Sequence, residues 1–386
     1  MMRCVTLARW SQRAACAGAT VALWLLAGCT LPATNFSQYP GFAELEATHP
    51  QRTSLPTASE QALLLRLRPR LFLPPGHVGL VDFYRDYIAQ GELRSGDGSL
   101  VSTQVTPEQL NRVKNDPRAV FRHLPQATGA AAPSVLARVD YEVLDAGSVR
   151  YPLTFLTYHA VFRQSGLVAG LPGWVERIAG WFVDLSDWHQ LDHYTAATIV
   201  LDPGQQPIAL VLQQHNYQHT YVFNTQFALP TDQRVAVDVA IRSNELYPHS
   251  ARRTEHRATR FHSPDELRYL MGSGAPPTLA GTDITEGRDE LSYTLAFLQP
   301  SDAFYTFKGF LGERRRLPGR DGPPGADYNT LPQLKRWTVQ MLMGFWREGD
   351  ASDLQRLESG YAKTGLPLDF VRAQTPIFVK AAGLAP

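Results

Sequence analysis

Alternation of apolar and polar side chains at every second residue is the feature that most constrains the fold of this chain. It is clearest at residues 235–241, where one face carries Val235, Val237, Val239 and Ile241. Residues 195–201 and 207–213 also have strand character, and the Asp-Pro-Gly-Gln sequence at 202–205 between them is typical of a turn. We therefore expect half-buried antiparallel strands, including a hairpin at 195–213, in a sheet core spanning about 135–311.

Helix signals precede this strand-rich region. Thr57 and Glu60 have the spacing of a capping box ahead of an apolar run, and Pro69 is expected to end that helix. A second helix is expected at about 81–90. A third is expected to begin at Thr106, because Thr can cap a helix and the proline that follows fits its first turn.

Two later segments also have helical character. Ser263 and Glu266 form another capping-box pattern, and residues 332–346 are expected to be helical. No repeat or heptad pattern divides the chain. The sequence therefore predicts one α+β domain over residues 57–386, in which an antiparallel β-sandwich-like core is flanked by N- and C-terminal helices.

The first 28 residues have the three-part composition of a signal peptide. Arg3, Arg9 and Arg13 precede an apolar stretch at 14–26, and small residues follow it. The apolar stretch is shorter than the roughly 20 residues that a membrane-spanning helix needs. Residues 1–28 are therefore expected to direct export and to be removed.

The end of this segment resembles the lipobox of bacterial lipoproteins, through the residues Leu26, Ala27, Gly28 and Cys29. That resemblance implies cleavage before Cys29 and attachment of lipid, including palmitate, to Cys29. By the rule of that family, Thr30 after the cysteine favours the outer membrane, so the body would be lipid-anchored at its periplasmic face. The alternative is an uncleaved anchor helix with an incidental cysteine.

The remaining residues of the N-terminal region and the cysteine content agree with this expectation. Residues 29–56 are rich in Pro, Thr, Ser and Gln without periodicity, which is typical of a tether. Cys4 and Cys16 lie in the segment expected to be removed, so the mature chain has no cysteine for a disulfide or a catalytic thiolate. It would carry 34 basic and 36 acidic side chains. A nucleic-acid partner, which calls for a basic domain, is therefore not expected.

Histidines concentrate in the middle of the chain. Eight of the eleven fall between positions 159 and 262: His159, His189, His193, His215, His219, His249, His256 and His262. Two pairs have i, i+4 spacing, which places both imidazoles on one face of either a helix or a strand. We therefore consider a divalent, zinc-like metal site whose candidate ligands are Asp187, His189, Asp192, His193, His215 and His219.

Two functions follow from this cluster. One is a metal-dependent hydrolase that uses His189, His193 and His215, with Asp192 as base or orienting group. The other is an envelope protein that binds a small-molecule ligand, a protein partner or a cation, with the histidines satisfied by backbone carbonyls and neighbouring side chains. We favour the second, because an enzyme should show a sharper constellation. His256 is expected to belong to a solvated basic stretch.

A second family resemblance covers about residues 151–249. An aromatic strand, an Asp-Trp element at 187–188, further strands and a closing turn at 243–248 resemble necrosis-inducing-type proteins and related vacuolar-sorting-type proteins in their order. The resemblance implies a β-sandwich. It also implies a cation site at the open end of the sandwich, for which Asp187, His189 and His215 match best.

Two segments have both a structural and a functional interpretation. Residues 166–182 are apolar and glycine-rich, and they are expected to form a helix that packs on the sheet. The alternatives are a helix that lies on a membrane or covers the histidine site. The basic stretch 313–324 is expected to be a solvated loop, with lipopolysaccharide phosphates as an alternative partner.

Overall fold

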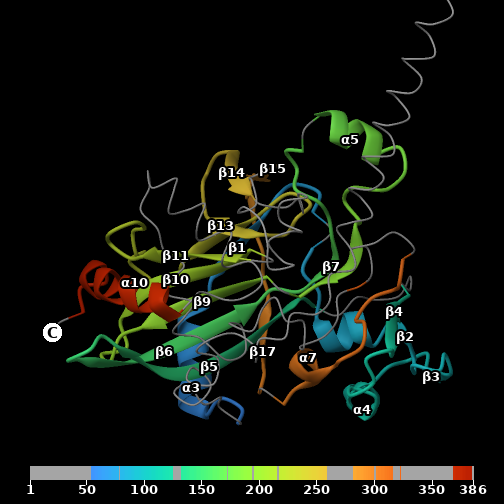
Figure 1. Ribbon diagram of the computed structural model, residues 1–386, viewed down its shortest axis with the longest axis horizontal. Helices are drawn as coiled ribbons and strands as arrows, with labels where there is room; N and C mark the ends of the chain where they lie inside the picture. The colour runs from blue at the N-terminus through green and yellow to red at the C-terminus, as the bar shows by residue number, and fades with distance from the viewer. Residues whose placement is uncertain are drawn as a thin grey trace, which may run out of the picture.

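The computed structural model describes a body of packed β-sheets (Figure 1). The described residues are 54–77, 79–124, 132–171, 173–193, 195–214, 217–258, 281–299, 301–315, 322 and 368–384. The expected signal peptide, Cys29, nearly all of the tether and the helices expected after Ser263 and at 332–346 lie outside these residues. Within the described part of the chain, no helix is both long and apolar enough to cross a membrane.

The largest sheet has six strands in the order β11-β10-β9-β6-β5-β17. Their bounds are Tyr217–Val222, Pro207–Gln214, Ala196–Leu201, Arg150–His159, Ser134–Asp145 and Thr294–Phe297. Every neighbouring pair is antiparallel except β17 with β5. The hairpin expected at 195–213 is confirmed as β9 and β10, and the polar turn between them leaves both strands in antiparallel register.

A second sheet has four strands in the order β13-β12-β1-β16. Their bounds are Leu246–Pro248, Ala236–Val239, Arg70–Leu73 and Asp289–Glu290. The alternating segment forms β12, but it pairs in parallel with β1 as well as antiparallel with β13. The expectation of antiparallel pairing is therefore only half right, because periodicity reports which face is buried and not the direction of the neighbouring strand.

One apolar core joins the two sheets. Val237 and Val239 of the small sheet belong to the same buried cluster as Leu156 and Leu210 of the large one. Shared burial between two sheet faces defines a sandwich-like arrangement. The α+β class with a largely antiparallel, sandwich-like core is thereby confirmed.

Helices lie against this core at both ends of the described chain. Helix α3 (Ala58–Leu67) begins at Thr57 with the expected capping box, and its Leu64 enters the inter-sheet core. Helix α10 (Leu368–Ala381) lies against the other side of the large sheet, where Phe378 packs with the outer apolar residues of that sheet (Figure 1). Truncating a buried leucine such as Leu64 to alanine typically costs about 2–5 kcal/mol of stability.

Smaller elements complete the body. Strands β2 (Gly91–Arg94), β3 (Leu100–Ser102) and β4 (Val120–His123) form a three-stranded sheet. The helix expected at 81–90 is a π-helix, Phe83–Ile88, and the one expected at Thr106 is α4, Pro107–Arg112. With α7 (Ala303–Thr306), these elements enclose a second apolar core. Strands therefore begin well before residue 135, the expected start of the sheet core.

Two short two-stranded sheets carry His189, Asp192, His256 and Asp283. Strand β7 (Phe162–Ser165) pairs antiparallel with β8 (His189–Asp192), and β14 (Thr254–Ala258) pairs antiparallel with β15 (Gly281–Thr285). Between β7 and β8 the chain forms helix α5, Gly173–Ala179. In Figure 1, α5 stands at one end of the molecule, apart from the large sheets.

Candidate functional site

Asp187, a predicted metal ligand, is held by an arginine. Arg315 Nη2 lies 3.0 Å from both carboxylate oxygens of Asp187, and Nη1 donates to the carbonyls of Asp187 and Trp188. Arg315 also bonds Glu313, and its side chain is only 13% exposed. A fork-like guanidinium placed on a carboxylate neutralises the charge that would attract a cation. The expectation of a solvated basic loop is therefore wrong for Arg315.

Asp192 is a fully buried carboxylate with donors on both oxygens. Asn244 Nδ2 donates to Oδ2 at 3.0 Å, and Thr195 Oγ1 donates to Oδ1 at 3.2 Å. Asn244 Oδ1 in turn lies 2.8 Å from His77 Nε2, and His77 Nδ1 accepts a bond from the Gly79 amide. Because Nδ1 accepts, Nε2 carries the proton, and burial lowers the pKa of His77. Asp192 thus belongs to a chain of interior hydrogen bonds.

His189 and His193 both belong to the body of the protein. The Nδ1 of His189 lies 3.1 Å from the carbonyl of Gln190, and burial lowers the pKa of His189. His193 is buried with its ring edge-on to Phe304, at 5.3 Å between centroids. His159 packs against the same phenylalanine, and burial holds its pKa well below the usual value. His159 and His193 therefore occupy core positions beside the same phenylalanine.

The second predicted histidine pair lies elsewhere in the fold. His219 is on β11, the outer strand of the six-stranded sheet, whereas β8 pairs with β7 in a separate sheet. The ring of His219 stacks on Tyr221 at 4.1 Å, and burial lowers its pKa to about 3. His215 lies outside the described residues. Among the residues that are described, no group of three or more His, Cys, Asp or Glu side chains is arranged to hold a metal ion.

The turn between β12 and β13 brings together polar residues that sequence reasoning did not select as a site. Arg242 and Asn244 have φ of 70° and 62°, in the left-handed region that asparagine tolerates better than most residues. Ser243 and Glu245, their neighbours in the chain, are buried together with Asn244. The turn therefore sends consecutive polar side chains into the protein.

Two buried carboxylates meet beside this turn. Tyr247 Oη lies 2.8 Å from Asp283 Oδ2 and 3.3 Å from Glu245 Oε2, and Ser243 Oγ donates to Asp283 Oδ1 at 2.8 Å. His256 stacks on the Tyr247 ring at 3.8 Å between centroids. The expectation that His256 belongs to a solvated basic stretch is therefore wrong, because strand β14 turns its imidazole onto an aromatic face.

The same part of the chain holds a carboxylate–histidine pair. His249 Nδ1 lies 2.6 Å from Oδ1 of Asp238, which is fully buried, and the Ser250 amide donates to the other carboxylate oxygen at 2.9 Å. Burial raises the pKa of Asp238, against these two bonds. The His249 ring stacks on Phe72 at 3.9 Å, and the side chain is 26% exposed. A carboxylate that fixes one ring nitrogen orients the other for an external partner, as in general bases and metal-bound histidines.

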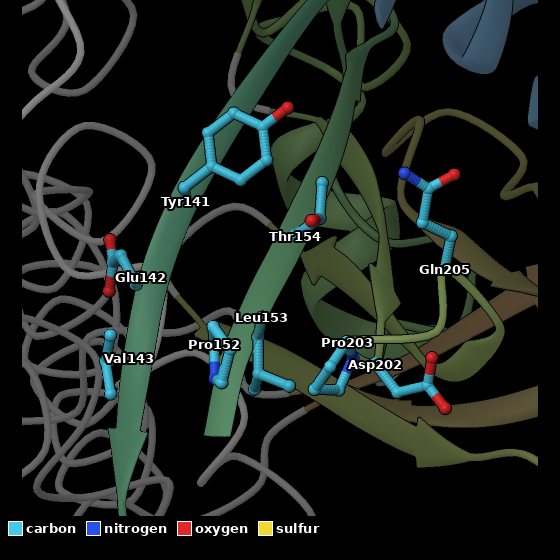
Figure 2. Close-up of a pocket in the computed structure, with 9 residues that line it drawn as sticks. All are labelled: Tyr141, Glu142, Val143, Pro152, Leu153, Thr154, Asp202, Pro203 and Gln205. Atoms are coloured by element: carbon cyan, nitrogen blue, oxygen red, sulfur yellow. The ribbon is translucent and has the colours of Figure 1, made fainter. Parts of the chain in front are cut away.

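A shallow pocket lies beside β5 and β6 of the large sheet (Figure 2). It has a volume of about 250 Å³ and is lined by Tyr141, Glu142, Val143, Pro152, Leu153, Thr154, Asp202, Pro203 and Gln205. These residues come from β5, β6 and the turn that joins β9 to β10. The Tyr141 side chain at its rim is 54% exposed, and its hydroxyl donates to Glu60 of α3 at 2.6 Å. The volume falls just below the usual range for small-molecule sites, so it suits a small group or a short segment of chain.

Comparison with known proteins adds no relative: no family model, no curated protein and no solved structure matches the chain.

Proposed function

We propose that this chain is a lipoprotein of the bacterial outer membrane, held at the periplasmic face by lipid on Cys29, and that its β-rich body acts by binding a ligand or partner. The anchor part rests on the lipobox-like residues before Cys29 and on the short apolar stretch ahead of them. Thr30 supports the outer rather than the inner membrane.

The proposal that the body is a binding protein rests on the partners of the predicted metal ligands in the fold. The carboxylate of Asp187 is neutralised by Arg315, and both oxygens of Asp192 accept bonds from interior donors. A hydrolytic metal centre needs carboxylates and imidazoles that converge on one open position. The side chains of these two aspartates instead stabilise the fold, which favours a binding protein over a metal-dependent hydrolase.

Incorporation of radiolabelled palmitate tests the anchor. Wild-type protein should carry the label and fractionate with the outer membrane, whereas Cys29→Ala should lose both properties. The substitution Thr30→Asp is a matched control, because it keeps the lipidated cysteine and should redirect the labelled protein to the inner membrane. Labelling that persists in Cys29→Ala would overturn the proposal.

Metal analysis tests the choice of binding over hydrolysis. The purified full chain should contain no stoichiometric zinc, copper, iron or nickel, and His189→Ala should not change its metal content. One equivalent of metal that is lost in His189→Ala and in Asp192→Asn would establish the hydrolase alternative instead.

Site-specific photo-crosslinking tests the pocket as the binding site. A photoreactive phenylalanine at Tyr141 stands at the pocket rim, and the same residue at Leu100, which is 52% exposed on β3, is the control. A discrete envelope adduct from position 141 and none from position 100 is expected. Identical behaviour of the two positions would exclude the pocket.

A further inference from the structure

Three aromatic side chains at one end of the molecule are exposed to solvent. Trp174 is 59% exposed, Trp181 79% and Phe182 76%, and these are the most exposed large apolar side chains among the described residues. They lie on α5 and in the turn that follows it. Single apolar residues scattered over a surface are normal. Three large exposed aromatic side chains within nine positions form a patch, and such a patch often marks an interaction site. We call these three residues the aromatic tip.

The base of this tip is firmly attached to the body. Arg242 Nη2 bonds Glu176 of α5 at 2.9 Å and the Ala169 carbonyl at 2.6 Å. Backbone bonds in both directions join Gly170 to Thr282 of β15. The helix is therefore held by charge and backbone contacts, and its aromatic side chains project outward from a fixed support.

Among the described residues, the apolar cluster of this segment contains no strand residue. Buried Ala179 of α5 clusters with Val168, Leu171 and Leu185, all from the segment between β7 and β8. The expectation that the helix packs on the sheet is therefore wrong. In Figure 1, α5 stands clear of both large sheets.

We propose that the aromatic tip inserts into the interfacial region of a lipid bilayer, as a second membrane contact beside the lipid on Cys29. This inference rests on the proposed anchor, which would confine the body near a membrane surface. Tryptophan favours the boundary between headgroups and acyl chains, because its ring is apolar and its N–H is polar. An inserted aromatic patch adds buried apolar area to the attachment that the lipid on Cys29 provides.

The charges near the tip largely compensate one another. The only acidic side chain of α5, Glu176, is paired with Arg242, so its negative charge is compensated. Arg177 of the same helix is exposed, and it would meet the phosphate groups of the lipids when the aromatic residues are inserted. Asp184, two positions after Phe182, is also exposed and offsets this attraction, so the insertion depends mainly on the aromatic area.

Tryptophan quenching by brominated lipid tests the insertion. The full chain is reconstituted into vesicles of phosphatidylethanolamine and phosphatidylglycerol whose acyl chains carry bromine. Trp181→Phe keeps the apolar ring and removes one reporter, so the quenched fraction should fall. Trp188→Phe removes one reporter that stays in the body beside β8, so the quenched fraction should rise rather than fall. Equal quenching in the two variants would overturn the proposal.

A disruptive variant gives the second readout. Trp181→Glu combined with Phe182→Glu should lower the quenched fraction further than Trp181→Phe does, because Trp174 is then withdrawn as well, whereas Leu100→Glu, at an exposed apolar residue far along the chain, should not lower it. Neither tip residue belongs to a described core cluster, so the double variant should keep the wild-type urea midpoint. Quenching of the double variant equal to that of the wild type would refute insertion. Insertion would also be refuted if the double variant lost a protein partner while its quenching by lipid stayed the same.

The two proposals fail in different ways. If palmitate labels Cys29 but quenching does not depend on the tip, the anchor stands and the insertion is wrong. If Cys29 carries no lipid and the tip-dependent quenching persists in Cys29→Ser, the insertion stands and the anchor is wrong.

Discussion

His256 should make the folded protein sensitive to mild acid. Its ring stacks on Tyr247, and its Nε2 lies 3.0 Å from Thr285 Oγ1. Burial lowers the pKa of His256 to about 4, while the carboxylate of Asp283 acts in the opposite direction. In the unfolded chain a histidine titrates at about 6.5. Between these two values the unfolded chain binds a proton that the folded protein excludes.

The sign and size of the effect follow from this difference. Above pH 6.5 the imidazole is neutral in both states, and the contribution of His256 to stability is fully present. As the pH falls toward 4, the unfolded chain is protonated first, so the folded protein loses this stability. Integrated from pH 7 to pH 5, the loss for one such histidine is at most about 2 kcal/mol, and partial solvent access reduces it toward about 1 kcal/mol. The substitution His256→Gln removes the titration and keeps an amide that can bond Thr285.

Urea unfolding at pH 7 and pH 5 measures this contribution. The wild type should lose about 1–2 kcal/mol more than His256→Gln between the two pH values. Arg252→Gln is the control: it removes an exposed charge four residues away and should keep the wild-type pH dependence. If His256→Gln and the wild type lose the same free energy, the imidazole is protonated in the folded state and the reasoning is wrong.

Three further predictions concern buried polar groups. Burial raises the pKa of Asp302 to about 6, so its effect on stability is favourable below pH 4 and is lost as the pH rises through 6. Asp302→Asn should therefore melt above the wild type at pH 8 by the equivalent of about 1–3 kcal/mol and lose that advantage at pH 4, as measured by thermal scans. Arg138→Met breaks a 2.7 Å pair with Asp140, both nearly buried, and should cost about 3–5 kcal/mol in urea unfolding at pH 7. Gly287→Ala would place a Cβ 2.0 Å from Asp238 Oδ1, and it should lower the urea midpoint by the equivalent of at least about 1–3 kcal/mol.

Different outcomes would contradict each of these. A higher melting temperature of Asp302→Asn that is independent of pH would show that the gain comes from helix capping rather than from the carboxyl group. A cost below about 1 kcal/mol for Arg138→Met would mean that water reaches the pair. A wild-type midpoint for Gly287→Ala would mean that the loop moves away from Asp238 at little cost.

Local features of the sequence were enough to predict much of the fold. The capping box at Thr57 is satisfied by neighbouring residues, so it needs no tertiary contact to be recognised. The hairpin at 195–213 was predictable because its turn residues are consecutive, and the buried face of β12 because alternation reports burial directly. Pairing of β12 with β1 joins segments about 165 positions apart, and no local pattern encodes such a partner.

The candidate site shows the same limit. The sequence identified histidines and aspartates that are close in the chain. In the folded protein these side chains do not converge on one point, because β8 and β11 belong to different sheets. The pairs that did form, such as Asp238 with His249, join residues whose strands are brought together by the register of β12 and β13. The Ser-Asn-Glu sequence at 243–245 was the signal that could have marked this turn, because asparagine tolerates the left-handed conformation that Asn244 adopts.

The sequence by itself determined the expectation of export and lipidation at Cys29, and the α+β class, because these depend on residues that act as neighbours. The tertiary structure decided which acidic and histidine side chains are buried or paired, and which apolar side chains remain exposed to solvent. Arg315 neutralises Asp187 across 128 positions, and Arg242 holds α5 so that Trp181 remains exposed. Burial and charge pairing are properties of position in space, so only the folded chain assigns them.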